Sequence, residues 1–362
     1  MSNPKNMQTI RIANRAIGAG ASPYVIAELS ANHNGAFESA LHLIESAAKA
    51  GADAIKLQTY TADTLTLDCD SEEFRISGGL WNGKTLYQLY QEAHTPWDWH
   101  SELFDHAEKL GITIFSSPFD RTAVDFLENL NCPAYKIASF ESVDLALIRY
   151  AASTGKPIII STGMSDFDEI QESIEAAREA GCTELAILHC VSGYPAPPAD
   201  YNLRTIPDMI SQFGLVTGLS DHTLGTATAI TSIALGASIL EKHFTLDRGR
   251  GGPDDSFSLE PPELASLCRD AREAWASLGG VNYARKSSEE KNMQFRRSLY
   301  FVRDLNEGDQ ITEDSIRSVR PGFGLAPKYF DAVLGRTLNR SVRANTPVRW
   351  DEINGEPVNG HK

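Results

Sequence analysis

The order of apolar and helical segments predicts a parallel α/β barrel of eight strands. Eight short apolar runs alternate with helix-length amphipathic stretches over the first two thirds of the chain. Several helical stretches end in glycine, at Gly51, Gly111, Gly181 and Gly236, and glycine best tolerates the left-handed helix stop. Runs that are apolar throughout are typical of strands buried on both faces, and a count of eight favours a TIM barrel.

The expected strands are short runs that continue into polar residues. They cover residues 24–30, 54–60, 112–118, 134–139, 157–163, 185–190, 214–220 and 237–244. Helical patterns separate most of them, for example over 39–52, 122–131, 167–181 and 226–237. A doubly wound sheet is the alternative fold. No glycine-rich dinucleotide fingerprint follows the first run, which disfavours that alternative.

Two segments depart from this repeat. Residues 8–22 are expected to form a short hairpin that caps the bottom of the barrel. Residues 61–100 are too many for one strand-to-helix connection, so we expect an ordered insertion beside the active site. Its aromatic part, residues 80–100, is expected to pack as core or as a lid that excludes water.

The pattern changes near Ser277, where a polar stretch replaces the alternation of runs and helices. Short strand-like pieces follow (RSLYFVR, DSIRSVR, RTLNRSVR and TPVRW) and no long helix, which indicates a small, mostly-β domain docked on a barrel. The expected organisation is a barrel with its hairpin over residues 1–280, a linker over 281–295, the small domain over 296–354 and a disordered tail over 355–362.

Composition indicates a globular enzyme or binding protein of the cytoplasm. Of the 362 residues, 42% are hydrophobic and 22% are charged, and the net charge of −15 argues against a nucleic-acid partner. No run is long and apolar enough to span a bilayer, and the amino-terminal residues lack the apolar core of a signal peptide. Five scattered cysteines without CxxC spacing are typical of reduced thiols.

Polar side chains follow nearly every expected strand. In a TIM barrel the catalytic groups come from the carboxyl ends of the strands and the loops after them, so these residues are expected to converge. They are, in chain order, Glu28, Asn32, His33, Lys56, Gln58, Ser116, Ser117, Lys136, Ser139, Glu141, Ser161, Thr162, His189, Ser192, Tyr194, Ser220, Asp221, His222, Glu241, Lys242 and His243.

Two histidines are candidate metal ligands. His222 and His243 follow strands seven and eight, which are neighbours in a closed barrel. Two imidazoles there can bind a divalent ion such as Mn²⁺ and leave positions open for water and substrate. The alternative is that one of them is a hydrogen-bonded structural histidine. The remaining histidines are expected to be structural (His33, His189) or exposed to solvent (His42, His94, His100, His106).

Two lysines lie within apolar runs, in AIKLQ and AYKIA. A lysine buried at such a position is costly unless it meets an anion, so Lys56 and Lys136 are expected to bind a phosphate or carboxylate in the barrel mouth. Alternatively, one of them forms a Schiff base, as in barrel aldolases. Neighbouring hydroxyls are expected to assist them: Ser117, Ser139, Ser161 and Ser220.

Glu28 and Glu141 are the candidates for acid–base catalysis. Each follows an apolar strand, where partial burial can tune its protonation. Spacing alone leaves a salt bridge to Lys56 or Lys136 open as the alternative role for either glutamate.

Nine ordered motifs resemble those of the sialic acid synthase family: AELSANHNG, AIKLQTY, FSSPFD, AYKIASFE, ISTGM, LHCVSGYP, GLSDHT, LEKHFTLDR and SVRPGFG. The resemblance covers about residues 25–353. It implies a TIM barrel joined to a carboxyl-terminal antifreeze-like (SAF, β-clip) domain. The stretches GGLWNGKTLYQLYQEAHTPWDWH, RRSLYFVRD and VRPGFGLAPKY resemble in particular the branch that makes pseudaminic acid.

The resemblance implies a condensation of phosphoenolpyruvate with an open-chain N-acylated amino sugar, in which a C–O bond breaks and phosphate leaves. In the pseudaminic branch the sugar is 2,4-diacetamido-2,4,6-trideoxy-L-altrose, whereas sibling branches make N-acetylneuraminate or legionaminate. A Schiff-base pyruvate aldolase is a more distant alternative. The polar strand ends disfavour a sugar- or ice-binding protein without catalysis.

The resemblance also implies roles for individual residues. Arg320 in SVRPGFG matches an arginine that reaches the sugar's N-acyl group from the partner subunit, so a dimer with exchanged carboxyl-terminal domains is expected. Ser192 stands where sialic acid synthases proper tend to carry Asn, which fits the pseudaminic branch better. The implied sets are the catalytic residues Glu28, Glu141 and His243; the phosphoenolpyruvate site of Lys56, Ser117, Lys136, Ser139, Ser161, Ser192 and Ser220; the sugar site of Gln58, Tyr194, Asp254 and Arg320; and the ligands His222 and His243 for Mn²⁺, or for Mg²⁺ or Co²⁺.

Overall fold

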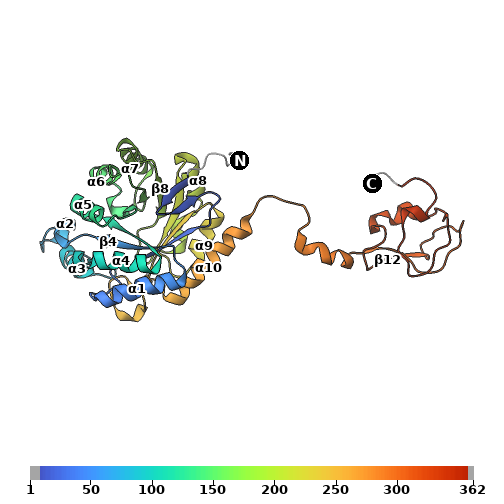
Figure 1. The fold of residues 1–362 in the computed structure, drawn as a ribbon, viewed down its shortest axis with the longest axis horizontal. Helices are drawn as coiled ribbons and strands as arrows, with labels where there is room; N and C mark the ends of the chain where they lie inside the picture. The colour runs from blue at the N-terminus through green and yellow to red at the C-terminus, as the bar shows by residue number, and fades with distance from the viewer. Residues whose placement is uncertain (1–8, 358–362) are drawn as a thin grey trace. The chain divides into compact units, whose positions relative to one another are not determined.

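The protein was analysed as a computed structural model, which describes residues 9–357. The chain divides between Gly279 and Gly280 into two compact units (Figure 1). Of the tail expected over 355–362, residues 358–362 lie outside the described part of the chain.

The first unit is a closed barrel of eight parallel strands in the order β10-β3-β4-β5-β6-β7-β8-β9. Pairing of β10 with β3 closes the barrel. The predicted TIM barrel is therefore confirmed, and the doubly wound sheet was the wrong alternative. The strands are β3 (Tyr24–Glu28), β4 (Ala54–Thr59), β5 (Thr113–Pro118), β6 (Tyr135–Ile137), β7 (Ile158–Ser161), β8 (Leu185–Cys190), β9 (Val216–Asp221) and β10 (Ile239–His243).

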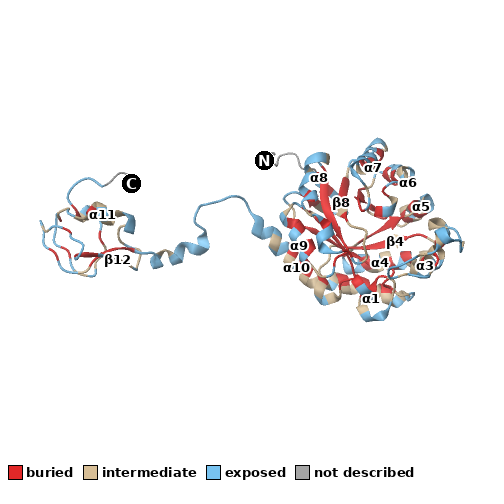
Figure 2. Cartoon of the chain, turned by 180° about the vertical axis from the view of Figure 1, so that it is seen from behind, coloured by how far each residue is buried: buried red, intermediate tan, exposed pale blue. Residues whose placement is uncertain are grey.

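Helices surround the barrel, and the strands at its centre are buried (Figure 2). Asp120, Asp144 and Asp166 accept backbone N–H groups at helix starts, which satisfies donors that the first turn leaves free. Gly51 and Gly111 end two helices in the left-handed conformation, as expected. The surrounding helices are α1 (Phe37–Ala50), α4 (His100–Leu110), α5 (Arg121–Asn129), α6 (Leu145–Ala152), α7 (Phe167–Glu179), α8 (Thr205–Phe213), α9 (Ala227–Ala234) and α10 (Pro261–Leu278).

An antiparallel hairpin precedes the barrel, formed by β1 (Thr9–Ile12) and β2 (Arg15–Gly18). Its buried isoleucines Ile10, Ile12 and Ile17 share one apolar cluster with residues that begin barrel strands. The hairpin thus covers the amino ends of the strands and leaves the carboxyl ends for the site.

The insertion between β4 and α4 is ordered. It holds α2 (Ala62–Leu65) and α3 (Leu86–Ala93), with 3₁₀ turns η2 (Glu72–Phe74) and η3 (Trp97–Trp99). Trp97 stacks on Phe126 with ring centroids 4.7 Å apart and donates through Nε1 to the carbonyl of Tyr60 at 3.1 Å. These contacts fix the insertion against the barrel.

The second unit has its own small core around Leu299, Phe301 and Ile311. Its two paired strands are β11 (Ser298–Phe301) and β12 (Ile316–Val319). The later strand-like pieces form only isolated bridges, such as Gln310 with Thr337, because loops join them closely. The other elements of the second unit are α11 (Phe330–Val333) and the 3₁₀ helices η8 (Ser287–Phe295), η9 (Pro327–Tyr329) and η10 (Trp350–Glu352).

The first unit contains four further 3₁₀ helices, η4 (Ser139–Glu141), η5 (Pro198–Tyr201), η6 (Arg248–Arg250) and η7 (Asp255–Phe257).

None of the helices within residues 9–357 has the length and apolar character needed to cross a membrane.

Candidate active site

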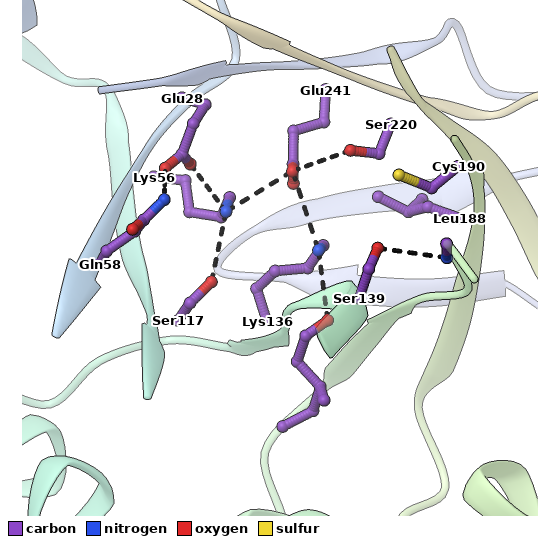
Figure 3. A network of polar contacts seen from close by, with 12 residues as sticks. Glu28, Lys56, Gln58, Ser117, Lys136, Ser139, Leu188, Cys190, Ser220 and Glu241 are labelled. Carbon is purple, nitrogen blue, oxygen red and sulfur yellow. Dashed lines mark hydrogen bonds and ion pairs between the residues drawn. The ribbon is translucent and has the colours of Figure 1, made fainter. Parts of the chain in front are cut away.

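Four buried charged side chains meet inside the carboxyl end of the barrel (Figure 3). The ammonium Nζ of Lys56 on β4 lies 2.7 Å from Glu28 Oε2 on β3 and 3.5 Å from Glu241 Oε1 on β10. Lys136 Nζ on β6 lies 3.8 Å from the same Glu241 oxygen. Glu241 therefore lies between the two lysines. We call these four residues the inner network.

Hydroxyl and amide groups surround the inner network. Lys56 donates to Ser117 Oγ at 3.2 Å, and Ser220 donates to Glu241 Oε1 at 3.3 Å. Gln58 Nε2 donates to Glu28 Oε1 at 2.9 Å. The structure thus brings together residues that were predicted from five different strand ends.

Burial and mutual contact set the charges of the network. Burial raises the pKa of Glu28, and Lys56 only partly opposes this. Burial acts in the same direction on Glu241, but Lys136 and Lys56 outweigh it and lower the pKa of that carboxyl. Burial lowers the pKa of Lys136, whereas Glu241 and Glu28 keep the pKa of Lys56 above its ordinary value. Glu241 is thus the carboxylate that both lysines hold ionised.

Glu241 was expected among the converging polar residues, but the sequence analysis gave it no role in the site, although it lies on the last barrel strand. A signal was available: side chains two apart on a strand point to the same face. Glu241 is two residues before His243, so an inward His243 implied an inward Glu241. For Glu28, the salt bridge to Lys56 that spacing left open is present.

Serine side chains lie close together around Gly163. Gly163 donates its backbone N–H to Ser139 Oγ at 3.2 Å. A Cβ at Gly163 would lie 2.3 Å from Ser192 Oγ and 2.7 Å from Ser139 Oγ, so any larger residue would displace these hydroxyls. The hydroxyls of Ser161 and Ser192 are buried without a hydrogen-bond partner. Buried hydroxyl donors without partners suit a bound oxyanion.

The two candidate metal ligands face each other across β9 and β10. The imidazole centroids of His222 and His243 are 5.4 Å apart. His222 Nδ1 lies 2.9 Å from the carbonyl of Val191, which leaves its Nε2 free, as in metal-binding histidines held by a second contact. His243 Nδ1 is buried without a partner, and burial keeps the pKa of His243 well below its ordinary value.

These histidines fit a metal site that is only partly made of protein. Within residues 9–357 no three His, Cys, Asp or Glu side chains form a group able to hold an ion. Two neutral imidazoles with free nitrogens suit a divalent metal whose other positions belong to water or substrate. Asp254 Oδ2 lies 3.8 Å from His243 Nδ1 and accepts a hydrogen bond from Ser30 instead.

A cavity of about 400 Å³ opens beside these groups. Its polar side includes Gln58, Glu141, His243 and Asp254. Burial raises the pKa of Glu141 to about 7, and its Oε2 has no hydrogen-bond partner. The Tyr194 ring lies 4.4 Å from that of His222 and also borders the cavity. The cavity therefore joins a weakly acidic carboxyl, the histidines and the sugar-side residues predicted from the sequence.

Two predicted positions lie elsewhere. Arg320 is exposed in the second unit, directly after β12, so its role in sugar binding stays a prediction. The expectation that His100 is exposed was wrong. Its ring is buried, with Nε2 2.9 Å from Thr59 Oγ1 and Nδ1 3.1 Å from the carbonyl of Pro96. His100 joins the insertion to β4, a tertiary contact that leaves no local pattern in sequence.

Comparison with known proteins assigns the class to which this barrel and site belong. Residues 43–283 match the NeuB family, and residues 296–354 match the SAF domain. The chain belongs to the NeuB family, and the resemblance found in its motifs is confirmed.

Two relatives and one solved structure show how similar the chain is to individual proteins. The chain is 42% identical to the pseudaminic acid synthase of Helicobacter pylori, over 91% of this chain and 98% of that protein. It is 43% identical to the pseudaminic acid synthase of Campylobacter jejuni, over 91% and 96% of the two chains. Among solved structures, the N-acetylneuraminic acid synthetase of Leptospira borgpetersenii superimposes with a TM-score of 0.71 at 30% identity, covering 80% and 96% of the chains.

Proposed function

We propose that this protein is a pseudaminic acid synthase. It condenses phosphoenolpyruvate with 2,4-diacetamido-2,4,6-trideoxy-L-altrose and water, and it releases phosphate. The inner network carries the proposal, because two buried lysines near serine hydroxyls without partners suit a small dianion or trianion. The identity to two pseudaminic acid synthases over nine tenths of the chain supports this sugar over those of sibling synthases.

Phosphoenolpyruvate is proposed to bind over the lysines. Lys56 and Lys136 face its phosphate and carboxylate, and Ser117, Ser139, Ser161, Ser192 and Ser220 supply hydroxyls around them. Binding in a closed polar pocket replaces water by fixed donors and orients the enol carbon toward the sugar.

The proposed reaction forms one C–C bond and breaks one C–O bond. Enolpyruvate C3 attacks the sugar aldehyde carbon, and the oxygen of a water molecule adds to C2. The tetrahedral centre at C2 then collapses to a carbonyl and expels inorganic phosphate with its bridging oxygen. Overall, one proton of the water moves to the alkoxide that forms on the sugar, and the other leaves with the phosphate as HPO₄²⁻.

Two glutamates are proposed to move the proton from water to the alkoxide. Glu28 lies next to Lys56 with a raised pKa and is proposed to accept the proton from water. Glu141, with a pKa raised by burial to about 7, is proposed to donate a proton to the alkoxide. Gln58, Tyr194 and Asp254 line the cavity and are proposed to orient the sugar.

His222 and His243 are proposed to hold a divalent metal, Mn²⁺ before Mg²⁺ or Co²⁺, in a site whose remaining positions water and substrate fill. When bound, the ion supplies Lewis-acid polarisation of the sugar aldehyde.

A homodimer with exchanged carboxyl-terminal domains is also proposed, in which Arg320 of one copy completes the sugar site of the other. Residues 280–362 hold 14 Lys and Arg against 11 Asp and Glu, so the negative charge of the chain belongs to the barrel unit. The loops of the barrel mouth expose apolar side chains, among them Phe140, Val143, Met164 and Leu224. Exposed apolar groups of this kind support the proposal that a domain of the partner subunit covers the mouth. A cytoplasmic location is supported by five free cysteines.

A substrate panel tests the proposed function. Phosphate release is measured with phosphoenolpyruvate and Mn²⁺, offering the altrose sugar, N-acetylmannosamine or the legionaminate precursor, with mass spectrometry of the products. Turnover of the altrose sugar, lost with a chelator, is expected. Turnover of another sugar would overturn the substrate assignment. Borohydride trapping of a lysine with pyruvate would instead indicate the Schiff-base aldolase.

A further inference from the structure

The insertion builds one wall of the cavity that holds the site. Apolar side chains from α2, the following loop and α3 line it: Leu65, Ile76, Leu86 and Leu89. Polar groups lie among the other lining residues, including Glu141, His243 and Asp254. A substrate in this cavity therefore meets hydrogen-bonding groups at its reacting end and aliphatic groups elsewhere.

Contacts with the barrel hold this wall in place. Trp81, also a lining residue, donates through Nε1 to the carbonyl of Pro253 at 3.1 Å, and its ring lies 6.0 Å from that of Tyr194. Tyr90 on α3 packs edge-on against Tyr60 with centroids 5.9 Å apart. The insertion is thus tied to both the β10 loop and the end of β4.

An aliphatic wall selects among sugars. Leucine and isoleucine side chains offer no hydrogen bond, so a sugar hydroxyl facing them loses water without replacement. A methyl group at the same place gains from leaving water. Such a wall would favour a methyl-bearing sugar without contacting the reacting atoms.

We infer that Leu65 and Ile76 are specificity-determining residues, which bind the methyl groups of a deoxygenated or N-acetylated sugar substrate. This inference rests on the proposed function, since it concerns the sugar used in that reaction. It assigns the choice of sugar to the insertion, whereas phosphoenolpyruvate binding belongs to the barrel strands.

A matched pair of leucines tests it. Leu65 lines the cavity, whereas Leu67, two residues later, is 67% exposed and does not line it. Leu65→Asn and Leu67→Asn are compared with the unsubstituted protein. The measured quantity is kcat/KM for the altrose sugar, for its 6-hydroxy analogue and for its N-formyl analogue. Ile76→Thr is a second lining variant, and circular dichroism with thermal unfolding establishes that each variant is folded.

The lining variants are expected to lose about 10- to 200-fold of the preference for the altrose sugar over at least one analogue, the range typical of one methyl contact. The KM for phosphoenolpyruvate and all values for Leu67→Asn should stay unchanged. An unchanged preference in folded Leu65→Asn and Ile76→Thr would overturn the inference while leaving the proposed function intact. Failure of the unsubstituted protein to use the altrose sugar would overturn the proposed function itself.

Discussion

Glu241 and Lys242 are adjacent on β10, yet Glu241 belongs to the inner network and Lys242 to a separate buried ion pair. Glu241 points into the barrel, where it lies between Lys56 and Lys136. Lys242 points outward and lies 3.2 Å from Asp221 of the neighbouring β9. Successive side chains of a strand point to opposite faces, so these two adjacent residues belong to two separate charged clusters.

The two clusters differ in how completely they are satisfied. In the outer pair Asp221 also accepts the backbone N–H of Thr223 at 2.8 Å, and Lys242 donates to the carbonyl of Thr223. In the inner network Glu241 Oε2 has no hydrogen-bond partner. A closed pair stabilises the strand ends that carry the two histidines, whereas an open network retains capacity for a ligand. Unsatisfied groups therefore distinguish the site from the scaffold.

Lys242→Met breaks the closed pair and should have the largest effect. It leaves the Asp221 carboxylate buried without its cation, which is expected to lower the free energy of unfolding by about 3–5 kcal/mol. Urea denaturation measures this change. The double variant Lys242→Met with Asp221→Asn should recover part of the loss, and equal stability of the single variant and the unsubstituted protein would refute the structural role.

Lys136→Met changes the open network and should act on activity instead. Glu241 keeps Lys56 and Ser220 as partners, so stability should change little. Loss of one charged contact to the bound anion is expected to lower kcat/KM for phosphoenolpyruvate about 100- to 1,000-fold. Phosphate-release kinetics check this, and near-normal kinetics would separate Lys136 from phosphoenolpyruvate binding.

Glu141 in the cavity should make the free energy of unfolding depend on pH. Its pKa is raised from 4.5 to about 7 in the folded protein, so the folded state keeps a proton that the unfolded chain releases within this window. The free energy of unfolding is therefore expected to fall by about 3 kcal/mol as the pH rises through that window. Denaturation across pH measures the slope, and Glu141→Gln should remove this contribution. The same slope in both proteins would contradict the assignment.

Gly163→Ala should have the smallest effect of the four. The added methyl group would displace the hydroxyls of Ser192 and Ser139. If the overpacking cost of about 1–3 kcal/mol falls on anion binding, the KM for phosphoenolpyruvate should rise about 5- to 150-fold. Gly193→Ala is the matched control, because the nearest atoms to its Cβ lie at 3.4 Å, an ordinary contact. A similar KM in both variants would place the anion elsewhere.

Local pattern was sufficient to predict the barrel and the polar residues that converge at its carboxyl end. Buried strands appear in the sequence as apolar runs. The polar residues toward their carboxyl ends, such as Lys56 and His243, converge once the barrel closes. Contacts between distant segments were not predictable in this way. The hydrogen bond between His100 and Thr59 and the aliphatic wall of the cavity both depend on how the insertion folds back onto the barrel. In the small unit, short bridges replaced expected strands because loop packing, not periodicity, decides pairing there.

The fate of the bridging oxygen of phosphoenolpyruvate tests the central claim most directly. Phosphoenolpyruvate labelled with ¹⁸O between C2 and phosphorus is turned over with the altrose sugar, and both products are analysed by mass spectrometry. C–O cleavage over the inner network predicts that the label leaves with inorganic phosphate. Label retained in the sugar acid would mean P–O cleavage and would contradict the proposed reaction.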